Sequence, residues 1–87
     1  MMFKSVDRRI ADLGFKVVEE NRYGVAYERE YKGGYPYGNQ RVEIYNEGKG
    51  GMPILQSYET GSTCCVVPVP YDELRLFMKK MRKLGMS

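Results

Sequence analysis

Apolar residues recur at helical spacing near both ends of the chain. At the start, Phe3, Val6, Ile10 and Leu13 lie three or four residues apart and form one stripe of a short amphipathic helix. Gly14 follows at the position where a left-handed helix cap is favoured. The pattern therefore predicts a helix that ends at Leu13.

The second helical pattern covers Asp72–Leu84 and is the best marked of the chain. Pro68 and Pro70 precede it and Gly85 follows it, and such residues are typical of the boundaries of an element. We expect its apolar stripe to face a β-sheet. The stripe consists of Leu74, Phe77, Met78, Met81 and Leu84.

Between the two helices the apolar residues change to the alternating pattern of β-strands. Val42 and Ile44, for example, are expected inside, with polar neighbours outside. Short turns between successive strands favour an antiparallel meander. The predicted strands are Phe15–Glu20, Val25–Tyr31, Arg41–Asn46, Pro53–Glu59 and Thr63–Val67. Residues 1–87 thus predict a single α+β domain, in which N-terminal and C-terminal helices pack on one face of a four- or five-stranded sheet.

The composition agrees with this fold class. A chain of 87 residues can bury one hydrophobic core, and its 43% hydrophobic and 29% charged residues are ordinary for a soluble domain. No apolar run approaches the roughly 18 residues of a membrane-spanning helix, and the first residues lack the apolar region of a signal peptide. We expect a cytoplasmic protein with no membrane partner.

Residue types that carry catalysis or bind metals are scarce. The chain has no histidine, and its two cysteines, Cys64 and Cys65, are adjacent, which is not a metal-ligand spacing. We expect both to be reduced and mostly buried, while a vicinal disulfide or a reactive thiol stays open. Glu19 and Glu20 point to opposite faces if they lie on a strand, so they do not pair for acid–base chemistry. The sequence predicts no enzyme, no metal and no cofactor.

All of the net positive charge lies at the C-terminal end. Residues 1–69 carry nine basic and nine acidic side chains, so the net charge of +3 comes from residues 70–87. Basic residues at the end of a helix stabilise it through the helix dipole. This favours a simple interpretation, in which the basic face of the helix is exposed to solvent and binds no partner. The alternative is an electrostatic footprint for phosphates or for an acidic protein. The basic residues are Arg75, Lys79, Lys80, Arg82 and Lys83.

Two apolar features suggest contact with another protein. Leu76 is expected to project into the middle of the basic face, where nucleic acid would offer it nothing to bury against. Tyr35 and Tyr37 lie on a Gly-rich loop, and exposed tyrosines on loops are common interface anchors. The strand tyrosines are more simply explained as half-buried sheet residues than as a platform for bases.

Several short motifs spread over most of the chain carry a family resemblance. They are Phe3-Lys4-Ser5, Leu13-Gly14-Phe15, Tyr27-Glu28-Arg29, Leu55-Gln56-Ser57-Tyr58 and Leu76-Phe77-Met78-Lys79-Lys80-Met81. In these motifs the chain resembles small phage- and prophage-type proteins of Firmicutes, for which no family function is known. The resemblance implies a bacterial or phage cytoplasmic setting and a host-interacting accessory role.

The helix–strands–helix order also resembles the double-stranded-RNA-binding fold. That family carries two lysines at the start of its last helix and a histidine on a loop, whereas Lys79 and Lys80 lie in mid-helix here and the chain has no histidine. The resemblance therefore concerns topology alone, and no residue role follows from it.

Two functional hypotheses result. The first is a small non-enzymatic protein-binding module, with a host protein or a second copy as partner, that uses Leu76, Tyr35 and Tyr37. The alternative is a weak, sequence-tolerant nucleic-acid-binding protein. Its contacts would be Arg75, Lys79, Lys80, Arg82 and Lys83.

Overall fold

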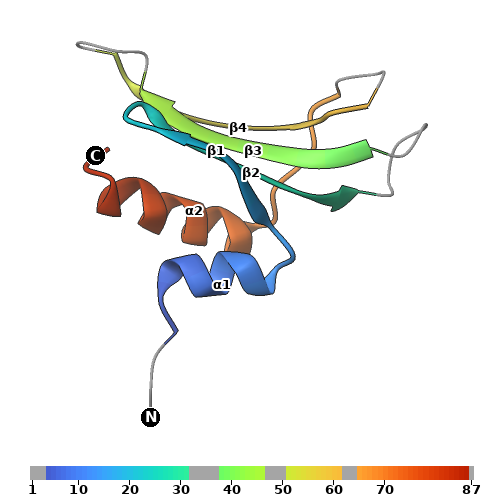
Figure 1. Cartoon of the computed structure of the whole chain (residues 1–87), viewed down its shortest axis with the longest axis horizontal. Coiled ribbons are helices and arrows are strands. Elements are labelled where there is room, and N and C mark those ends of the chain that lie inside the picture. The colour runs from blue at the N-terminus through green and yellow to red at the C-terminus, as the bar shows by residue number, and fades with distance from the viewer. Residues whose placement is uncertain (1–3, 32–37, 47–50, 62–64, 87) are drawn as a thin grey trace.

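The computed structural model describes residues 4–31, 38–46, 51–61 and 65–86. Four antiparallel strands form one sheet in the order β1-β2-β3-β4, and both helices lie beneath one of its faces (Figure 1). This confirms the predicted α+β meander. The elements are α1 (Val6–Asp12), β1 (Lys16–Asn21), β2 (Gly24–Tyr31), β3 (Gly38–Asn46), β4 (Pro53–Glu59) and α2 (Tyr71–Lys83). Within the described residues, neither helix has the length and apolar character needed to cross a membrane.

Helix α1 has a side-chain cap at its start and ends where its sequence predicts. The Ser5 hydroxyl caps its first turn by accepting a hydrogen bond of 3.1 Å from the backbone N–H of Arg8. At the other end, Leu13 donates its N–H to the Ile10 carbonyl, and Gly14 adopts a φ of 96°. Only glycine takes this conformation readily, so the chain can leave the helix there and enter β1.

The turn between β1 and β2 depends on one polar residue, Asn21, and one glycine, Gly24. The Asn21 side chain accepts hydrogen bonds from the backbone N–H groups of Tyr23 and Gly24, at 2.8 and 3.3 Å. A Cβ atom at Gly24 would overlap the backbone carbonyl of Ile44 on the neighbouring strand. Glycine is therefore required where β2 begins.

The core lies between the helices and the sheet. Val42, Ile44 and Phe77 have no exposed surface, which confirms the predicted inward residues of β3 and the centre of the α2 stripe. The Phe77 ring packs edge-to-face on Phe15 with ring centroids 5.3 Å apart, and it lies 5.6 Å from the ring of Tyr27. These aromatic contacts join α2 to the sheet and to the start of β1.

The fifth predicted strand, Thr63–Val67, does not form as a strand among the described residues of that range. A single bridge joins Val66 to Tyr58, with hydrogen bonds of 2.8 Å from Glu59 N–H to the Cys65 carbonyl and 3.1 Å from Val67 N–H to the Ser57 carbonyl. Pro68 and Pro70 then prevent a longer ladder because they lack an N–H. Residues 65–67 nevertheless cover part of the open edge of β4.

The predicted burial of the cysteines is wrong for the described member of the pair, whereas its predicted reduced state agrees with the structure. Cys65 is a free thiol and is exposed rather than buried, because it lies on the connection outside β4. Cys64 lies outside the described residues.

Helix α2 is rotated relative to its predicted orientation. Met78 and Leu84, expected in the core, are 44% and 42% exposed, whereas Leu76, expected in solvent, packs against the core cluster. The physical reason is that α2 has two neighbours. It contacts α1 as well as the sheet, so its buried surface extends toward the side that carries Leu76.

Candidate functional site

Two charged contacts hold α2 in this orientation. The guanidinium of Arg29 on β2 forms a two-pronged ion pair with the Glu73 carboxylate, with N–O distances of 2.8 and 3.3 Å. The same guanidinium lies over the Phe15 ring, 4.2 Å from its centroid, and donates to the Leu13 carbonyl. Arg29 therefore links the start of α2 to the sheet and to the end of α1.

The second contact removes one cation from the predicted basic face. The ammonium of Lys80 lies 2.8 Å from the Asp7 carboxylate of α1, and only 12% of the Lys80 side chain is exposed. Lys80 therefore belongs to the junction between the helices. Its prediction as a solvent-facing cation was wrong because the position of α1 was not known from the spacing of residues along α2.

The other predicted cations lie on the side of α2 that points away from the core. None of the four forms an ion pair with any described residue, and two apolar side chains lie among them. Tyr71 is 71% exposed and Met78 is 44% exposed, and Arg75 lies over the Tyr71 ring with its guanidinium carbon 5.8 Å from the centroid. We call this surface the α2 outer face; it consists of Tyr71, Arg75, Met78, Lys79, Arg82 and Lys83.

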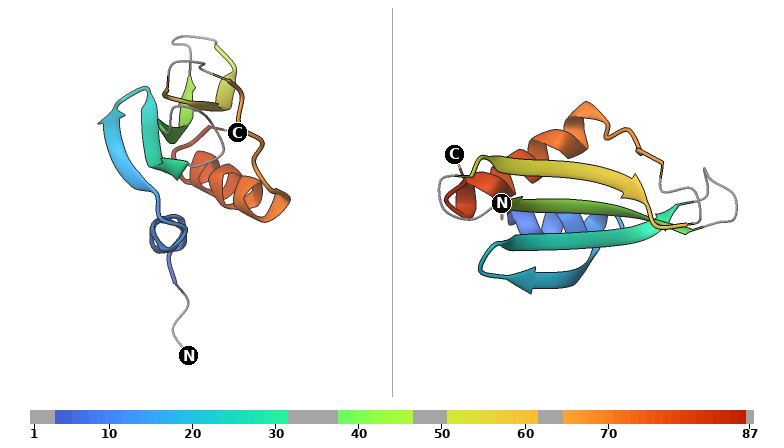
Figure 2. Two further views of the ribbon diagram at one scale, coloured as in Figure 1. Left: turned by 90° about the vertical axis from the view of Figure 1, so that its right-hand side faces the viewer. Right: turned by 90° about the horizontal axis from the view of Figure 1, so that it is seen from above.

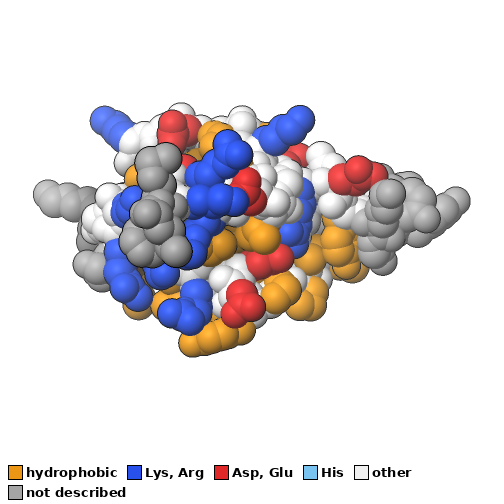
Figure 3. Space-filling model, turned by 90° about the horizontal axis from the view of Figure 1, so that it is seen from below, with side chains coloured by type: hydrophobic (Ala, Val, Ile, Leu, Met, Phe, Trp, Pro, Cys, Tyr) orange, Lys and Arg blue, Asp and Glu red, His pale blue; other side chains and the backbone are white. Residues whose placement is uncertain are grey.

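Figure 3 views the molecule from the side of the helices. Most of the Lys and Arg side chains gather over one half of this side, and orange hydrophobic side chains are exposed next to them. The apolar members of the α2 outer face were missed by sequence reasoning. Met78 was assigned to the core stripe, and Tyr71 was placed before the helix.

A groove of about 540 Å³ borders the α2 outer face where the two helices meet. Leu13 and Leu76 contribute its apolar surface, and charged side chains of both helices surround them. Leu76 is thus half-buried at this junction and not an exposed contact spot. Sequence reasoning also missed that the N-terminal segment adds two cations here, Lys4 before α1 and Arg9 within it, although the polar side of α1 was a usable signal. The charged lining residues are Lys4, Arg9, Asp12, Asp72, Arg75 and Lys79.

Of the tyrosines considered from the sequence, the two on the Gly-rich loop lie outside the part of the chain that the structure describes, and two on the sheet lie within it. Tyr35 and Tyr37 lie outside the described residues, so their role as interface anchors stays a prediction. Tyr27 is buried, and Tyr23 is 47% exposed with the Arg22 guanidinium carbon 4.9 Å from its ring centroid.

The opposite face of the sheet is acidic and internally paired. The Arg41 guanidinium lies 2.8 Å from Glu19, 3.0 Å from Glu28 and 3.1 Å from Glu43. Burial raises the pKa of Glu43, but hydrogen bonds from Gln56, Arg41 and Tyr58 outweigh it and hold that pKa below its ordinary value. Three carboxylates around one cation repel phosphate, which argues against base stacking on this face.

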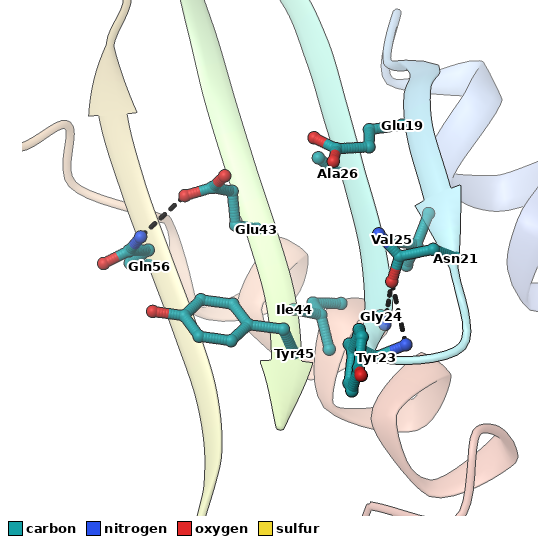
Figure 4. A pocket seen from close by; sticks show the side chains of 10 residues that line it. All are labelled: Glu19, Asn21, Tyr23, Gly24, Val25, Ala26, Glu43, Ile44, Tyr45 and Gln56. Carbon is teal, nitrogen blue, oxygen red and sulfur yellow. Dashed lines mark hydrogen bonds between the residues drawn. The ribbon is translucent and has the colours of Figure 1, made fainter. Parts of the chain in front are cut away.

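The same face carries a shallow pocket of about 310 Å³. Figure 4 shows Glu19 and Glu43 on either side of Ala26, with the rings of Tyr23 and Tyr45 at one end. Its carboxylates already have partners: Gln56 donates to Glu43 at 2.6 Å, and Glu19 pairs with Arg41. The pocket therefore offers no unpaired carboxylate to a ligand.

The described residues contain no candidate metal site. No group of three or more Cys, Asp or Glu side chains is placed there to hold a metal ion. The α2 outer face is therefore the strongest candidate site for the predicted function.

Comparisons with protein-family models, with curated proteins and with solved structures found no match to this chain. The phage-type resemblance stays a prediction.

Proposed function

We propose that this chain is a small non-enzymatic protein-binding module that docks an acidic surface of another protein on its α2 outer face. One observation carries the proposal. Exposed Tyr71 and Met78 lie on the same side of α2 as four cations, and these cations have no carboxylate partner among the described residues.

The residue types support a protein partner. Tyr, Met and Arg are enriched in the buried centre of protein interfaces, whereas Lys is more common at the rim. The two apolar side chains are seven residues apart, at positions 71 and 78, which is about two helical turns, and they therefore lie on the same side of α2. A partner could bury both of them at once.

The charges support an acidic partner. Four basic residues of the α2 outer face meet only Asp72 and Glu73 on the same helix, and Glu73 is already paired with Arg29. Unpaired surface charges of one sign accelerate association with a surface of the opposite sign and disfavour like-charged partners.

Site-specific photo-crosslinking tests the proposal. A benzophenone amino acid at Met78 should give protein adducts in a bacterial lysate, and the charge-reversed variant R75E/K79E/R82E should lose them. The matched control places the same cross-linker at Gln56, an exposed residue on the opposite face of the sheet. Equal adducts from both positions would contradict the proposal.

The same cross-linked lysate also tests the alternative that α2 binds nucleic acid. If α2 bound duplex DNA through its four free cations, log K would fall with log salt at a slope of about −3.6. Adducts at Met78 that disappear on nuclease treatment, together with such a slope, would replace the protein-binding proposal.

A further inference from the structure

The groove between α1 and α2 offers an accessible apolar surface. The two helices lie side by side and run in opposite directions, so that Asp7 near the start of α1 meets Lys80 late in α2 (Figure 1). Figure 2 shows α1 nearly end-on, with α2 beside it. Leu13 and Leu76 line the groove and are only half-buried, so part of each side chain stays open to an apolar group from outside.

The charges of this groove favour an acidic occupant. Its two carboxylates are Asp12 and Asp72, and Asp12 is already paired with the Lys4 ammonium at 2.7 Å. Three further cations form no ion pair with any described residue, so they face Asp72 as the one carboxylate without such a pair. The groove therefore attracts carboxylates and disfavours a basic segment. The three cations are Arg9, Arg75 and Lys79.

The walls of the groove favour a helical occupant over an extended one. Arg9 lies inside α1, and Arg75, Leu76 and Lys79 lie inside α2, where backbone N–H and C=O groups bond to one another along the helix. An extended segment that docks through its backbone would find no strand edge on these walls. A helix satisfies its own backbone and needs side-chain contacts only.

We propose that this groove binds an acidic amphipathic helix of another protein, which packs against α1 and α2 as a third helix. Apolar side chains of that helix contact Leu13 and Leu76, while its carboxylates pair with Arg9 on α1 and with the cations of α2. The inference rests on the proposed function, because the groove shares Arg75 and Lys79 with the α2 outer face, and it adds the kind of partner and a role for α1.

Two other anionic partners fit the groove less well. Duplex nucleic acid presents phosphates but no apolar side chain that could cover Leu13 and Leu76. An anionic membrane is flat on this scale, whereas the lining residues enclose a concave volume of about 540 Å³. An amphipathic helix supplies both the apolar stripe and the flanking carboxylates.

Titration with a defined helical peptide tests the inference. The probe is a capped peptide made of two copies of Leu-Ala-Gln-Leu-Glu-Ala-Glu, in which the glutamates flank the leucine stripe on both sides. On ¹⁵N-labelled full-length protein, it should shift the amides of α1 and α2, and its leucine methyl groups should give NOE cross-peaks to the methyl groups of Leu76.

Two control peptides separate charge from helical shape. A peptide with Lys in place of every Glu should not bind, because the groove already has an excess of cations. A peptide with Pro in place of the second Ala of each copy keeps the charges but cannot form the helix, and we expect it to bind at least about tenfold more weakly.

Two charge-reversal variants locate the contact. R9E changes a groove cation that lies on α1, outside the α2 outer face, and should weaken binding of the Glu peptide about fivefold. R22E is the matched control, because it changes the net charge equally on an exposed residue between β1 and β2. Binding to R22E should stay within about twofold of wild type. Spectra of each variant without peptide establish that it is folded.

Four results would each overturn the inference. They are no shift of α1 or α2 amides at about 1 mM peptide, the weak end of specific recognition, equal binding of the Glu peptide and either control peptide, equal loss of binding in R9E and R22E, and shifts of these amides by phosphatidylglycerol vesicles but not by the peptide. If one of these results is found while protein adducts at Met78 still depend on the α2 cations, the helix is refuted and the proposed function stands.

Discussion

The two outward surfaces of this small domain use charge in opposite ways. On the open face of the sheet, one cation, Arg41, is enclosed by Glu19, Glu28 and Glu43 within 3.1 Å. On the α2 outer face, four cations have no carboxylate partner among the described residues, and exposed Tyr71 and Met78 lie between them. The first arrangement stabilises the fold, whereas the second leaves its interactions to a partner.

Removing Arg41 should disrupt the ion-pair cluster on the open face of the sheet, and we expect it to have the largest effect on stability. In R41A three carboxylates remain close together on a surface where Arg41 itself is only 18% exposed. We expect a loss of about 3 kcal/mol in the free energy of unfolding, measured by urea denaturation. The control R22A removes an exposed arginine near the same sheet and should cost less than about 0.5 kcal/mol.

The anchor of α2 should be the next most sensitive point. E73A leaves the Arg29 guanidinium, 23% exposed, without its carboxylate, and we expect a loss of about 2 kcal/mol. The neighbouring D72A is a matched control, because both residues lie in the acidic first turn and share the helix-dipole interaction. Equal losses in the two variants would show that Arg29 does not hold α2.

Acid should weaken the sheet cluster before it affects the α2 outer face. The folded-state pKa of Glu43 is below its ordinary value of 4.5, so its ionised form stabilises the fold above that pH. This contribution is lost as the pH falls from 4.5 through the lower folded pKa. The stability difference between wild type and E43Q, measured by urea denaturation from pH 6 to pH 2, should shrink over that range and stay constant above it.

The substitution Y27F should have the smallest effect on stability at neutral pH. Y27F removes a buried hydroxyl without a described partner, so thermal unfolding should show a change within about 0.5 kcal/mol in either direction. Above pH 10 the wild type should lose stability more steeply than Y27F, because the unfolded tyrosine ionises before the folded one, whose pKa is about 12. A loss of 2 kcal/mol or more at neutral pH would indicate that the hydroxyl has a structural partner.

Local patterns predicted most of the fold and little of the site. The predicted strand Pro53–Glu59 has the same bounds as β4, and Gly14 correctly marks the end of the first helix. The rotation of α2 could not be predicted, since it depends on contacts between residues 44 and 73 positions apart in sequence. For the same reason Leu76 and Lys80 were placed in solvent, and Met78 was placed in the core.

The most direct test of the account measures folding and binding on one variant, R75E/K79E/R82E. Since these cations have no carboxylate partner among the described residues, the free energy of unfolding should change by less than about 1 kcal/mol. Protein adducts from a cross-linker at Met78 should fall at least tenfold. A stability loss as large as that of R41A, or unchanged adducts, would contradict the claim that the α2 outer face serves binding and not folding.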